Sequence, residues 1–278
     1  MNKYLLCIFF FIFNSICAYG TQNFPIMKYL VPIEVKEYDT GLESIDCIYV
    51  INLPHRGDRW KHMQRFFKKY NLHVNRVPAV NGWKFSKAQK AELTSPYQWR
   101  RSPGALGCLL SHVSILKDAY DREFSLIWIL EDDAEFLEDP ASLVPITSTL
   151  FAIDPDWDLL YTDRGYRIKG GRYLKGWWPD VRPHQKARPV SYYLAEEDCT
   201  EDILRIRSRI GTHSMILTRN GIKKLLDYFT SRPIWTAIDV DIHETPNLRE
   251  YCCKRDIVTN SVGIFFSDIT KSNRNKRR

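Results

Sequence analysis

The sequence predicts a single α/β domain with a mostly parallel central sheet and helices on both faces, and three observations support this. Continuous apolar runs, typical of buried strands, alternate with segments whose apolar residues recur at helical spacing. No internal repeat or low-complexity block interrupts this order. The chain has 278 residues, of which 44% are hydrophobic, and this is enough for one large core. The composition therefore excludes a disordered tail protein and a disulfide-stabilised miniprotein.

The first predicted unit is a strand, a helix and a second strand. Residues 48–53 are apolar and rich in β-branched side chains, as expected of a buried strand. A turn at residues 54–57 follows, and Asp58 is the predicted N-cap of a helix that ends near Tyr70. Residues 73–78 are the second predicted strand. This β-α-β start indicates parallel strands.

The later elements continue the alternation. Helical spacing predicts a helix over residues 104–122, and the apolar run at residues 125–130 predicts a buried strand. Residues 158–161 and 213–218 are two further predicted strands, and a helix over residues 220–229 is expected to be capped by its first residue, Asn220. The stretch from residue 166 to 202 has no clear periodicity and is rich in Gly, Pro, Trp, Tyr and Arg, which predicts long loops over a site.

The N-terminus has the pattern of a secretory signal peptide at residues 1–20. It combines Lys3, an apolar run and a small-residue exit before Thr21, and the run is shorter than the about 20 residues of a membrane span. An uncleaved short anchor and a lipoprotein signal ending at Cys17 are the alternatives. Residues 21–45 form a polar lead. We therefore expect a protein of the secretory pathway or an exported one; the alternative is a cytoplasmic, membrane-associated protein.

The net charge of +7 is concentrated at the C-terminus. Residues 269–278 form a basic tail with five Lys and Arg, and these together with Lys3 account for six of the seven net charges. The body of the chain is close to neutral, and its aromatic residues are not interleaved with a basic stripe, so nucleic acid is not an expected partner. The tail is a candidate for peripheral membrane contact.

Several common kinds of site are not predicted. The seven cysteines are too sparse for a disulfide scaffold, and no Cys/His cluster has the spacing of a zinc or redox site. A phosphate-binding P-loop, a Gly-rich dinucleotide fingerprint and a Gly-x-Ser-x-Gly turn are also missing from the sequence. Hydride transfer, P-loop hydrolysis and serine esterase chemistry therefore lack support.

Three adjacent acids follow the strand predicted at residues 125–130. Ligands of open α/β sheets bind beyond the carboxyl ends of strands, where Glu131, Asp132 and Asp133 are expected. Adjacent carboxylates repel one another unless a cation compensates, which favours Mn²⁺ or Mg²⁺. Such an ion neutralises charge on a departing diphosphate. The alternative is an acidic loop that faces solvent.

A second acidic set and a basic turn are further candidates. If residues 238–244 form a strand, Asp239, Asp241 and His243 lie on one face, which suits a general base, a sugar-hydroxyl acceptor or a metal ligand. An ordinary half-exposed strand is nearly as good an interpretation. The turn from Arg56 to Arg59 is placed to hold a diphosphate, although it is also a common helix start.

Six sequence blocks occur in the order found in one known family. They are VINL at 50–53 with Arg56, Asp58, Arg59 and Trp60 after it, RVPAVNG at 76–82, GALGCLLSH at 104–112, LEDDA at 130–134, GTHSMILTR at 211–219 and IDVD at 238–241. The chain resembles glycosyltransferase family 25, which includes bacterial lipooligosaccharide galactosyltransferases and procollagen galactosyltransferases. Pro54, His55 and Ala105 depart from the usual family residues.

The resemblance implies a GT-A-like domain, placed at residues 46–268, with UDP-galactose or a close relative as donor and a Mn²⁺-like ion. It implies that Asp133 contacts the metal and that Glu131 matches the other outer acid of the aspartate motif. Asp132 is expected to face the donor sugar or ribose. Asn52, Arg56 and Arg59 match the motif near the nucleotide. His112 matches a helix beside the donor pocket, where a structural role is equally compatible.

These features predict inverting transfer of a hexose to a hydroxyl of a glycan or glycosylated protein. The reaction needs a base for the acceptor hydroxyl and stabilisation of the leaving group. Asp239 or Asp241 is the expected base, Asp133 and Glu131 are the expected metal ligands, and His243 is a third. The alternative function is a non-catalytic secreted glycan-binding or adhesion module that retains the fold.

Overall fold

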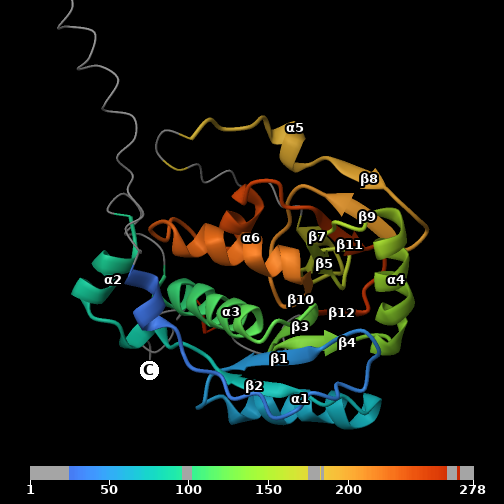
Figure 1. Cartoon of the computed structure of the whole chain (residues 1–278), viewed down its shortest axis with the longest axis horizontal. Coiled ribbons are helices and arrows are strands. Elements are labelled where there is room, and N and C mark those ends of the chain that lie inside the picture. The colour runs from blue at the N-terminus through green and yellow to red at the C-terminus, as the bar shows by residue number, and fades with distance from the viewer. Residues whose placement is uncertain (1–24, 96–101, 175–181, 183–184, 262–267, 270–278) are drawn as a thin grey trace, which may run out of the picture.

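The described residues form one α/β domain around an eight-stranded sheet (Figure 1). The structure is a computed structural model that describes residues 25–95, 102–174, 182, 185–261 and 268–269. The sheet order is β2-β1-β3-β10-β5-β11-β9-β8. Only β10 and β9 run against the common direction of the other strands of this sheet. The predicted α/β class is confirmed. The sheet contains both parallel and antiparallel pairs, although most of its strands run in the same direction.

The elements have the following bounds. The strands of the main sheet are β1 (Cys47–Asn52), β2 (Asn75–Pro78), β3 (Leu126–Glu131), β5 (Leu159–Tyr161), β8 (Glu196–Asp198), β9 (Ile203–Ile206), β10 (Ser214–Thr218) and β11 (Glu250–Cys253). Two small antiparallel pairs join β4 (Ala134–Phe136) to β12 (Val258–Asn260) and β6 (Tyr166–Arg167) to β7 (Tyr173–Leu174). The α-helices are α1 (Gly57–Tyr70), α2 (Lys87–Leu93), α3 (Pro103–Asp121), α4 (Leu143–Ile153), α5 (Val190–Tyr193), α6 (Arg219–Thr230) and α7 (Ile238–Asp241). The 3₁₀ helices are η1 (Pro25–Tyr29), η2 (Gly82–Lys84), η3 (Pro140–Ser142) and η4 (Ile242–Glu244).

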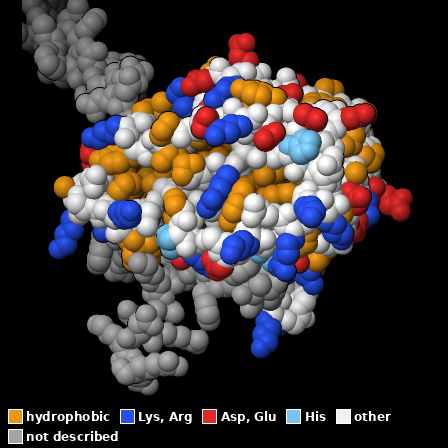
Figure 2. All heavy atoms as spheres, turned by 90° about the horizontal axis from the view of Figure 1, so that it is seen from below, with side chains coloured by type: hydrophobic (Ala, Val, Ile, Leu, Met, Phe, Trp, Pro, Cys, Tyr) orange, Lys and Arg blue, Asp and Glu red, His pale blue; other side chains and the backbone are white. Residues whose placement is uncertain are grey.

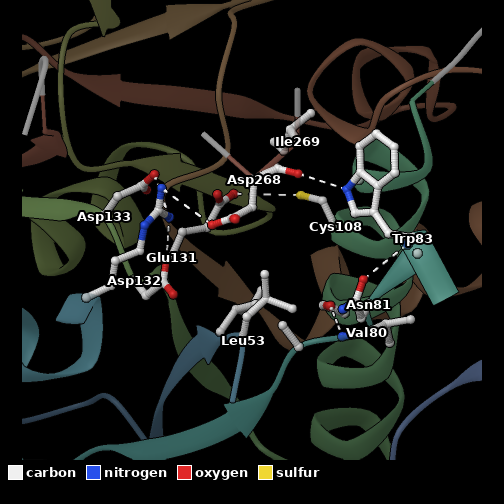
Figure 3. Close-up of a pocket in the computed structure, with 16 residues that line it drawn as sticks. Leu53, Val80, Asn81, Trp83, Cys108, Glu131, Asp132, Asp133, Asp268 and Ile269 are labelled. Carbon is white, nitrogen blue, oxygen red and sulfur yellow. Dashed lines mark hydrogen bonds and ion pairs between the residues drawn. The ribbon is translucent and has the colours of Figure 1, made fainter. Parts of the chain in front are cut away.

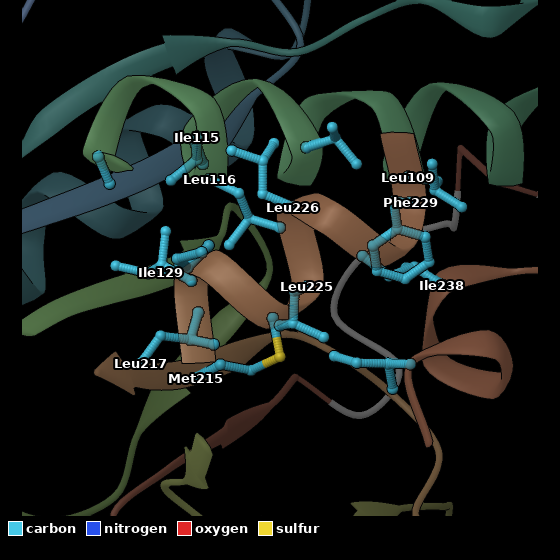
Figure 4. Packing of buried hydrophobic residues seen from close by; sticks show 14 of the residues in the cluster. Leu109, Ile115, Leu116, Ile129, Met215, Leu217, Leu225, Leu226, Phe229 and Ile238 are labelled. Atoms are coloured by element: carbon cyan, nitrogen blue, oxygen red, sulfur yellow. The ribbon is translucent and has the colours of Figure 1, made fainter. Parts of the chain in front are cut away.

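Two hydrophobic clusters lie on the two faces of the sheet. Side chains of β1 alternate between them: Tyr49 belongs to the cluster with α3 and α6, and Val50 belongs to the cluster with α1 and α4. Figure 4 shows α3 and α6 side by side, with Leu116 and Leu226 between the two helices and Met215 of β10 beside Leu225 on the sheet side of α6. Helices therefore cover both faces, as predicted.

The remaining parts of the chain add to the core and surface. The lead contributes the buried residues Ile26, Ile33 and Val35 to the α3 cluster. Among the described residues, no helix is both long and apolar enough to cross a bilayer. On the described part of the face in Figure 2, Lys and Arg side chains stand singly among hydrophobic, neutral and acidic ones. The predicted signal at 1–20 and residues 270–278 of the predicted tail lie outside the described residues.

Three local predictions are wrong. The predicted strands correspond to β1, β2, β3, β5 and β10, and the three predicted helices correspond to α1, α3 and α6. Helix α1 begins at Gly57 with Asp58 inside its first turn and has no side-chain cap. Helix α6 is capped by Thr218, whose Oγ1 accepts a hydrogen bond from the Gly221 amide, and not by Asn220. Residues 238–244 form α7 and η4 instead of a strand.

The helical form of residues 238–244 has a packing reason. Ile238 and Ile242 are four residues apart and both are buried in the α3 cluster. The same apolar positions fit a period of two or a helical turn, and burial against α3 selects the turn. In a helix, unlike in a strand, Asp239 and Asp241 do not point to the same side.

Glycines allow α3 to lie directly against the loop after β2. A Cβ on Gly107 would stand 2.3 Å from the Val80 carbonyl oxygen and 2.7 Å from the Gly82 amide nitrogen. The Val80 amide donates to Ser111 Oγ at 2.8 Å in the same contact. This close approach fixes the N-terminal half of α3 beside the carboxyl ends of the strands.

Replacing Gly107 with Ala should lower the free energy of unfolding by about 1–3 kcal/mol, because the added methyl group meets rigid backbone atoms. The matched control is Gly57→Ala at the start of α1, where the added Cβ has no atom within 4 Å. The control should be neutral or stabilising by up to about 1 kcal/mol. Urea unfolding monitored by circular dichroism measures both; equal stability of the two variants would contradict the contact.

Candidate functional site

A cavity opens where the carboxyl end of β3 lies beside the segment before β10 and the segment that follows β5. It has a volume of about 500 Å³, and its lining includes Glu131, Asp133, Tyr166, Thr212 and Asp239. This volume lies in the range of about 300–1,000 Å³ that is usual for ligand sites. A smaller pocket of about 80 Å³ adjoins it and shares Cys108, Glu131 and Asp133 (Figure 3). The location is the one predicted from the strand ends.

The three adjacent acids point in different directions. Asp132 is buried and accepts hydrogen bonds from Asn52 Nδ2 and from Arg59 Nη1, both at 2.6 Å. Asp133 lies on the other side of the same guanidinium group, with its Oδ2 3.0 Å from Arg59 Nη1. Glu131 turns away and accepts from Thr212 Oγ1 at 2.8 Å. The structure thus brings Asn52, Arg59 and the acids together, and one arginine compensates two of the carboxylates.

Glu131 and Asp133, two of the acids that line the cavity, are protonated more readily than free carboxylic acids. Burial raises the pKa of Glu131, and the neighbouring acids Asp132 and Asp239 add to the increase. Burial also raises the pKa of Asp133, with Glu131 as the next contribution, while Arg59 opposes the increase. Oxygen ligands in such an excess of negative charge favour a hard divalent cation.

The basic turn is paired with acids in this structure. Arg56 forms ion pairs with Asp58, at 2.8 Å, and with Asp268. The Asp268 carboxylate is also 4.0 Å from Arg59 Nη2, and its main-chain oxygen accepts from Trp83 Nε1 at 3.0 Å (Figure 3). Arg59 and Asp268 line the small pocket, and Arg56 reaches it only through its ion pair with Asp268. Asp268 is distant from them in the sequence, and no local pattern indicates this contact.

His112 lies inside the site and faces Glu131. Its side chain is 1% exposed, and its Nδ1 is 3.0 Å from the Cys108 carbonyl oxygen one helical turn earlier. Its Nε2 is 3.7 Å from Glu131 Oε1, and Cys108 Sγ is 4.0 Å from that same oxygen. The expectation that the cysteines form no metal-type cluster is thus corrected: Cys108, His112 and Glu131 form one. The sequence signal is the i, i+4 pair, but its third member comes from another strand.

The two aspartates of the second acidic set, Asp239 and Asp241, lie in different surroundings. Asp239 lines the cavity and accepts a hydrogen bond from the Gly211 amide at 3.2 Å. Asp241 is 1% exposed and is held by Arg182 Nη2 at 2.6 Å and by the Tyr228 hydroxyl at 2.8 Å. It does not line the cavity.

His243 is buried elsewhere, and both of its ring nitrogens have partners. Nδ1 lies 2.6 Å from Glu250 Oε2, and Nε2 lies near the main chain of Arg209. Neither nitrogen is directed at Glu131 or Asp133. Of the second set, the structure therefore places only Asp239 at the cavity.

A buried carboxylate behind the cavity was missed by the sequence reasoning. Asp163 accepts hydrogen bonds from Arg209, from His213 Nε2 at 2.8 Å and from Thr259 Oγ1 at 2.7 Å. Burial favours the neutral acid, but Arg209 and His213 outweigh it and hold the pKa of Asp163 well below its usual range. Asp163 follows the strand predicted at 158–161, so the strand-end rule that found Glu131 also applies to it.

Comparisons with known proteins agree on one family. Residues 45–154 match the family model described as Glycosyltransferase family 25 (LPS biosynthesis protein). Procollagen galactosyltransferase 2 of Homo sapiens is 32% identical over 232 residues, which are 77% of this chain and 33% of that protein. The Mus musculus protein of the same name is 33% identical over 224 residues, with the same two shares. A Homo sapiens protein named inactive glycosyltransferase 25 family member 3 is 29% identical over 131 residues, 44% of this chain and 22% of that protein. The chain spans a third or less of the length of these relatives.

Replacing Glu131 with Gln should change how the stability of the metal-free protein depends on pH. Because burial raises the pKa of Glu131, the folded chain keeps a proton over a range in which the unfolded chain has released it. The free energy of unfolding therefore falls as pH rises from the unfolded-state pKa of about 4.3 to the higher folded-state value. Glu131→Gln should be more stable than the wild type above this range and show a smaller fall.

Urea unfolding between about pH 4 and pH 8 measures this difference. The matched control is Glu34→Gln, because the Glu34 side chain is 79% exposed. The control should follow the wild-type pH dependence. A steeper fall in Glu131→Gln than in the wild type would contradict the sign of the shift.

Proposed function

The chain belongs to glycosyltransferase family 25, and on this basis we propose that it transfers a hexose from a UDP-sugar to a hydroxyl of a glycan or glycosylated protein. Galactose is the hexose that we propose first. The names of the most similar relatives, procollagen galactosyltransferases, support the choice of sugar. The observation that carries the proposal is the convergence of Glu131, Asp133 and Asp239 on one cavity at the strand ends.

Asp133 and Glu131 are the residues that would hold a Mn²⁺ or Mg²⁺ ion. Their fit is supported by the donor set, since both are partly buried carboxylates that line the cavity and desolvation raises the pKa of each. When bound, such an ion stabilises negative charge on a departing diphosphate. His243, the third ligand expected from the sequence, has both nitrogens engaged elsewhere and is left out of this proposal.

Asp239 is the proposed base for an inverting reaction. Its carboxylate accepts the proton of the acceptor hydroxyl, whose oxygen bonds to the anomeric carbon while the bond from that carbon to the β-phosphate oxygen breaks and UDP leaves. Its position at the cavity supports this role. Asp241, the other candidate, is enclosed by Arg182 and Tyr228, so we assign it to holding the local structure.

Asn52, Arg56, Arg59, Asp132 and His112 form the proposed donor-binding side. Guanidinium groups bind diphosphate oxygens well, and a donor diphosphate at Arg56 and Arg59 would take the place of the Asp268 carboxylate. Asp132 uses its carboxylate on Asn52 and Arg59, so its proposed effect on the donor sugar or ribose includes orienting that arginine. His112 lies on α3 behind the pocket.

The acceptor and the cellular compartment are further parts of the proposal. Tyr166, Arg167 and Lys169 line the cavity from the irregular segment, and we propose that this side receives the acceptor. We propose a secretory or exported location, as the N-terminal sequence predicts, with a cytoplasmic, membrane-associated enzyme as the alternative. The basic tail is a proposed peripheral membrane contact.

A non-catalytic glycan-binding or adhesion module is the second candidate function. One observation favours it: a relative from the same family carries the word inactive in its name. Calorimetry with UDP and Mn²⁺ separates the two functions, because an enzyme of this kind binds both and the module binds neither.

A donor screen with the purified full chain tests the proposed activity. UDP release is measured with UDP-galactose and other UDP-sugars, with and without Mn²⁺. Release that is fastest with UDP-galactose and needs the ion is expected. Asp133→Ala should lose the metal-dependent part of the activity, and full metal-dependent activity in this variant would contradict the assignment.

Asp239→Asn should lower kcat about 10²–10⁴-fold while UDP affinity stays within a few-fold of the wild type, because only proton transfer is removed. Asp227→Asn is the matched control, since Asp227 is exposed and pairs with Lys223 on the outer side of α6. It should retain wild-type kcat. An Asp239→Asn variant with unchanged kcat would assign the base elsewhere.

A further inference from the structure

We propose that Cys108, His112 and Glu131 form a second cation site, which takes a thiophilic divalent ion such as Zn²⁺ or Co²⁺ beside the proposed donor pocket. The site combines a sulfur, a ring nitrogen and a carboxylate oxygen, and these three atoms lie within 4.8 Å of one another. The inference does not depend on transfer activity, because it concerns binding of an ion by side chains that are already assembled.

The distances are close to those of a bound ion. His112 Nε2 and Cys108 Sγ are 3.7 and 4.0 Å from Glu131 Oε1. A tetrahedral ion with bonds of about 2.0–2.3 Å separates its ligand atoms by about 3.3–3.8 Å. Because the three ligand atoms lie within 4.8 Å of one another, a contraction of up to about 1 Å about the ion, through changes of side-chain torsion, would complete the geometry.

The histidine ring supplies an independent reason for a cation. The contact of Nδ1 with the Cys108 carbonyl places the ring proton on Nδ1, since a carbonyl only accepts. Nε2 then presents a lone pair toward the Glu131 carboxylate, which is also an acceptor when ionised. Nε2 is buried and makes no hydrogen bond among the described residues.

The three ligands are oriented before any ion binds. Cys108 and His112 lie one turn apart on α3, and the Cys108 carbonyl fixes the tautomer of the histidine, as second partners of metal-bound histidines do. Thr212 donates to Glu131 Oε1 and holds the carboxylate toward the helix. Figure 3 shows Cys108 directed toward Glu131 across the pocket. The entropy lost on binding an ion is correspondingly small.

The ligand types select the ion. A thiolate and an imidazole favour Zn²⁺ and Co²⁺ over Mg²⁺, whereas Glu131 with Asp133 offers only oxygen. Cys108 would bind as a thiolate and release its proton to solvent. Cys108 and Glu131 both line the cavity, so a fourth position would face it and hold a water molecule. Because Glu131 belongs to both sites, occupation of one alters the other.

Cobalt titration of the metal-free full chain under reducing conditions tests the proposal. We expect one Co²⁺ per chain and an ultraviolet absorption band from sulfur-to-cobalt charge transfer, which Zn²⁺ abolishes by displacing the cobalt. Cys108→Ser should lose the band, and His112→Asn should weaken Co²⁺ binding at least about 10-fold. Circular dichroism establishes that each variant is folded.

Cys199→Ser is the matched control, because Cys199 is a free cysteine that is partly exposed near β8 and β9. It should keep the band and the affinity. A folded wild type without the band, or a band that persists in Cys108→Ser, would overturn the site. UDP release with Mn²⁺ is a separate readout, so failure of the proposed transfer activity leaves the cobalt result unaffected.

Discussion

The site depends on the ion pairs that Arg59 makes with Asp132 and Asp133. Three adjacent acids at the end of a buried strand would repel one another, and a buried carboxylate without a partner is costly. Arg59 comes from α1, and Asn52 from the end of β1 donates to the same Asp132 carboxylate. The position of α1 against the sheet is thereby coupled to the conformation of the acidic turn. Arg59 therefore joins the packing of α1, which also rests on Met63 and Phe67, to the electrostatics of the cavity.

A second charged cluster, around Asp163, stabilises the structure behind the cavity. Asp163 is buried and accepts hydrogen bonds from Arg209, His213 and Thr259, so its carboxylate is used within the protein and not offered to a ligand. Asp239 lies in the cavity wall, and within the described part of the chain its one hydrogen bond comes from the main-chain amide of Gly211. The contrast between a satisfied acid and a sparsely partnered one is the structural reason to place proton transfer at Asp239.

The sequence predicted the strands, and the position of the three acids at the end of one strand, because both follow from local patterns. The run at residues 125–130 is apolar throughout, and the acids after it can only lie at the carboxyl end of β3. The segment at residues 238–244 was mispredicted because its isoleucines fit two periods, and only contact with α3 decides between them. Asp268, Arg182 and Asp163 were missed for a different reason. Their partners are brought to them by tertiary structure, which the spacing of residues along the chain does not contain.

Glu131 and Asp132 point in different directions at the end of β3. Glu131, the last residue of the strand, turns toward α3 and Thr212, and Asp132, in the turn that follows, contacts Arg59 and Asn52. Glu131 thereby stands between Asp133, an oxygen donor, and the sulfur and nitrogen of α3. In the two proposed cation sites, a hard ion would draw this carboxylate toward Asp133 and a thiophilic ion would draw it toward Cys108 and His112. The two proposals therefore depend on the rotamer of this single side chain.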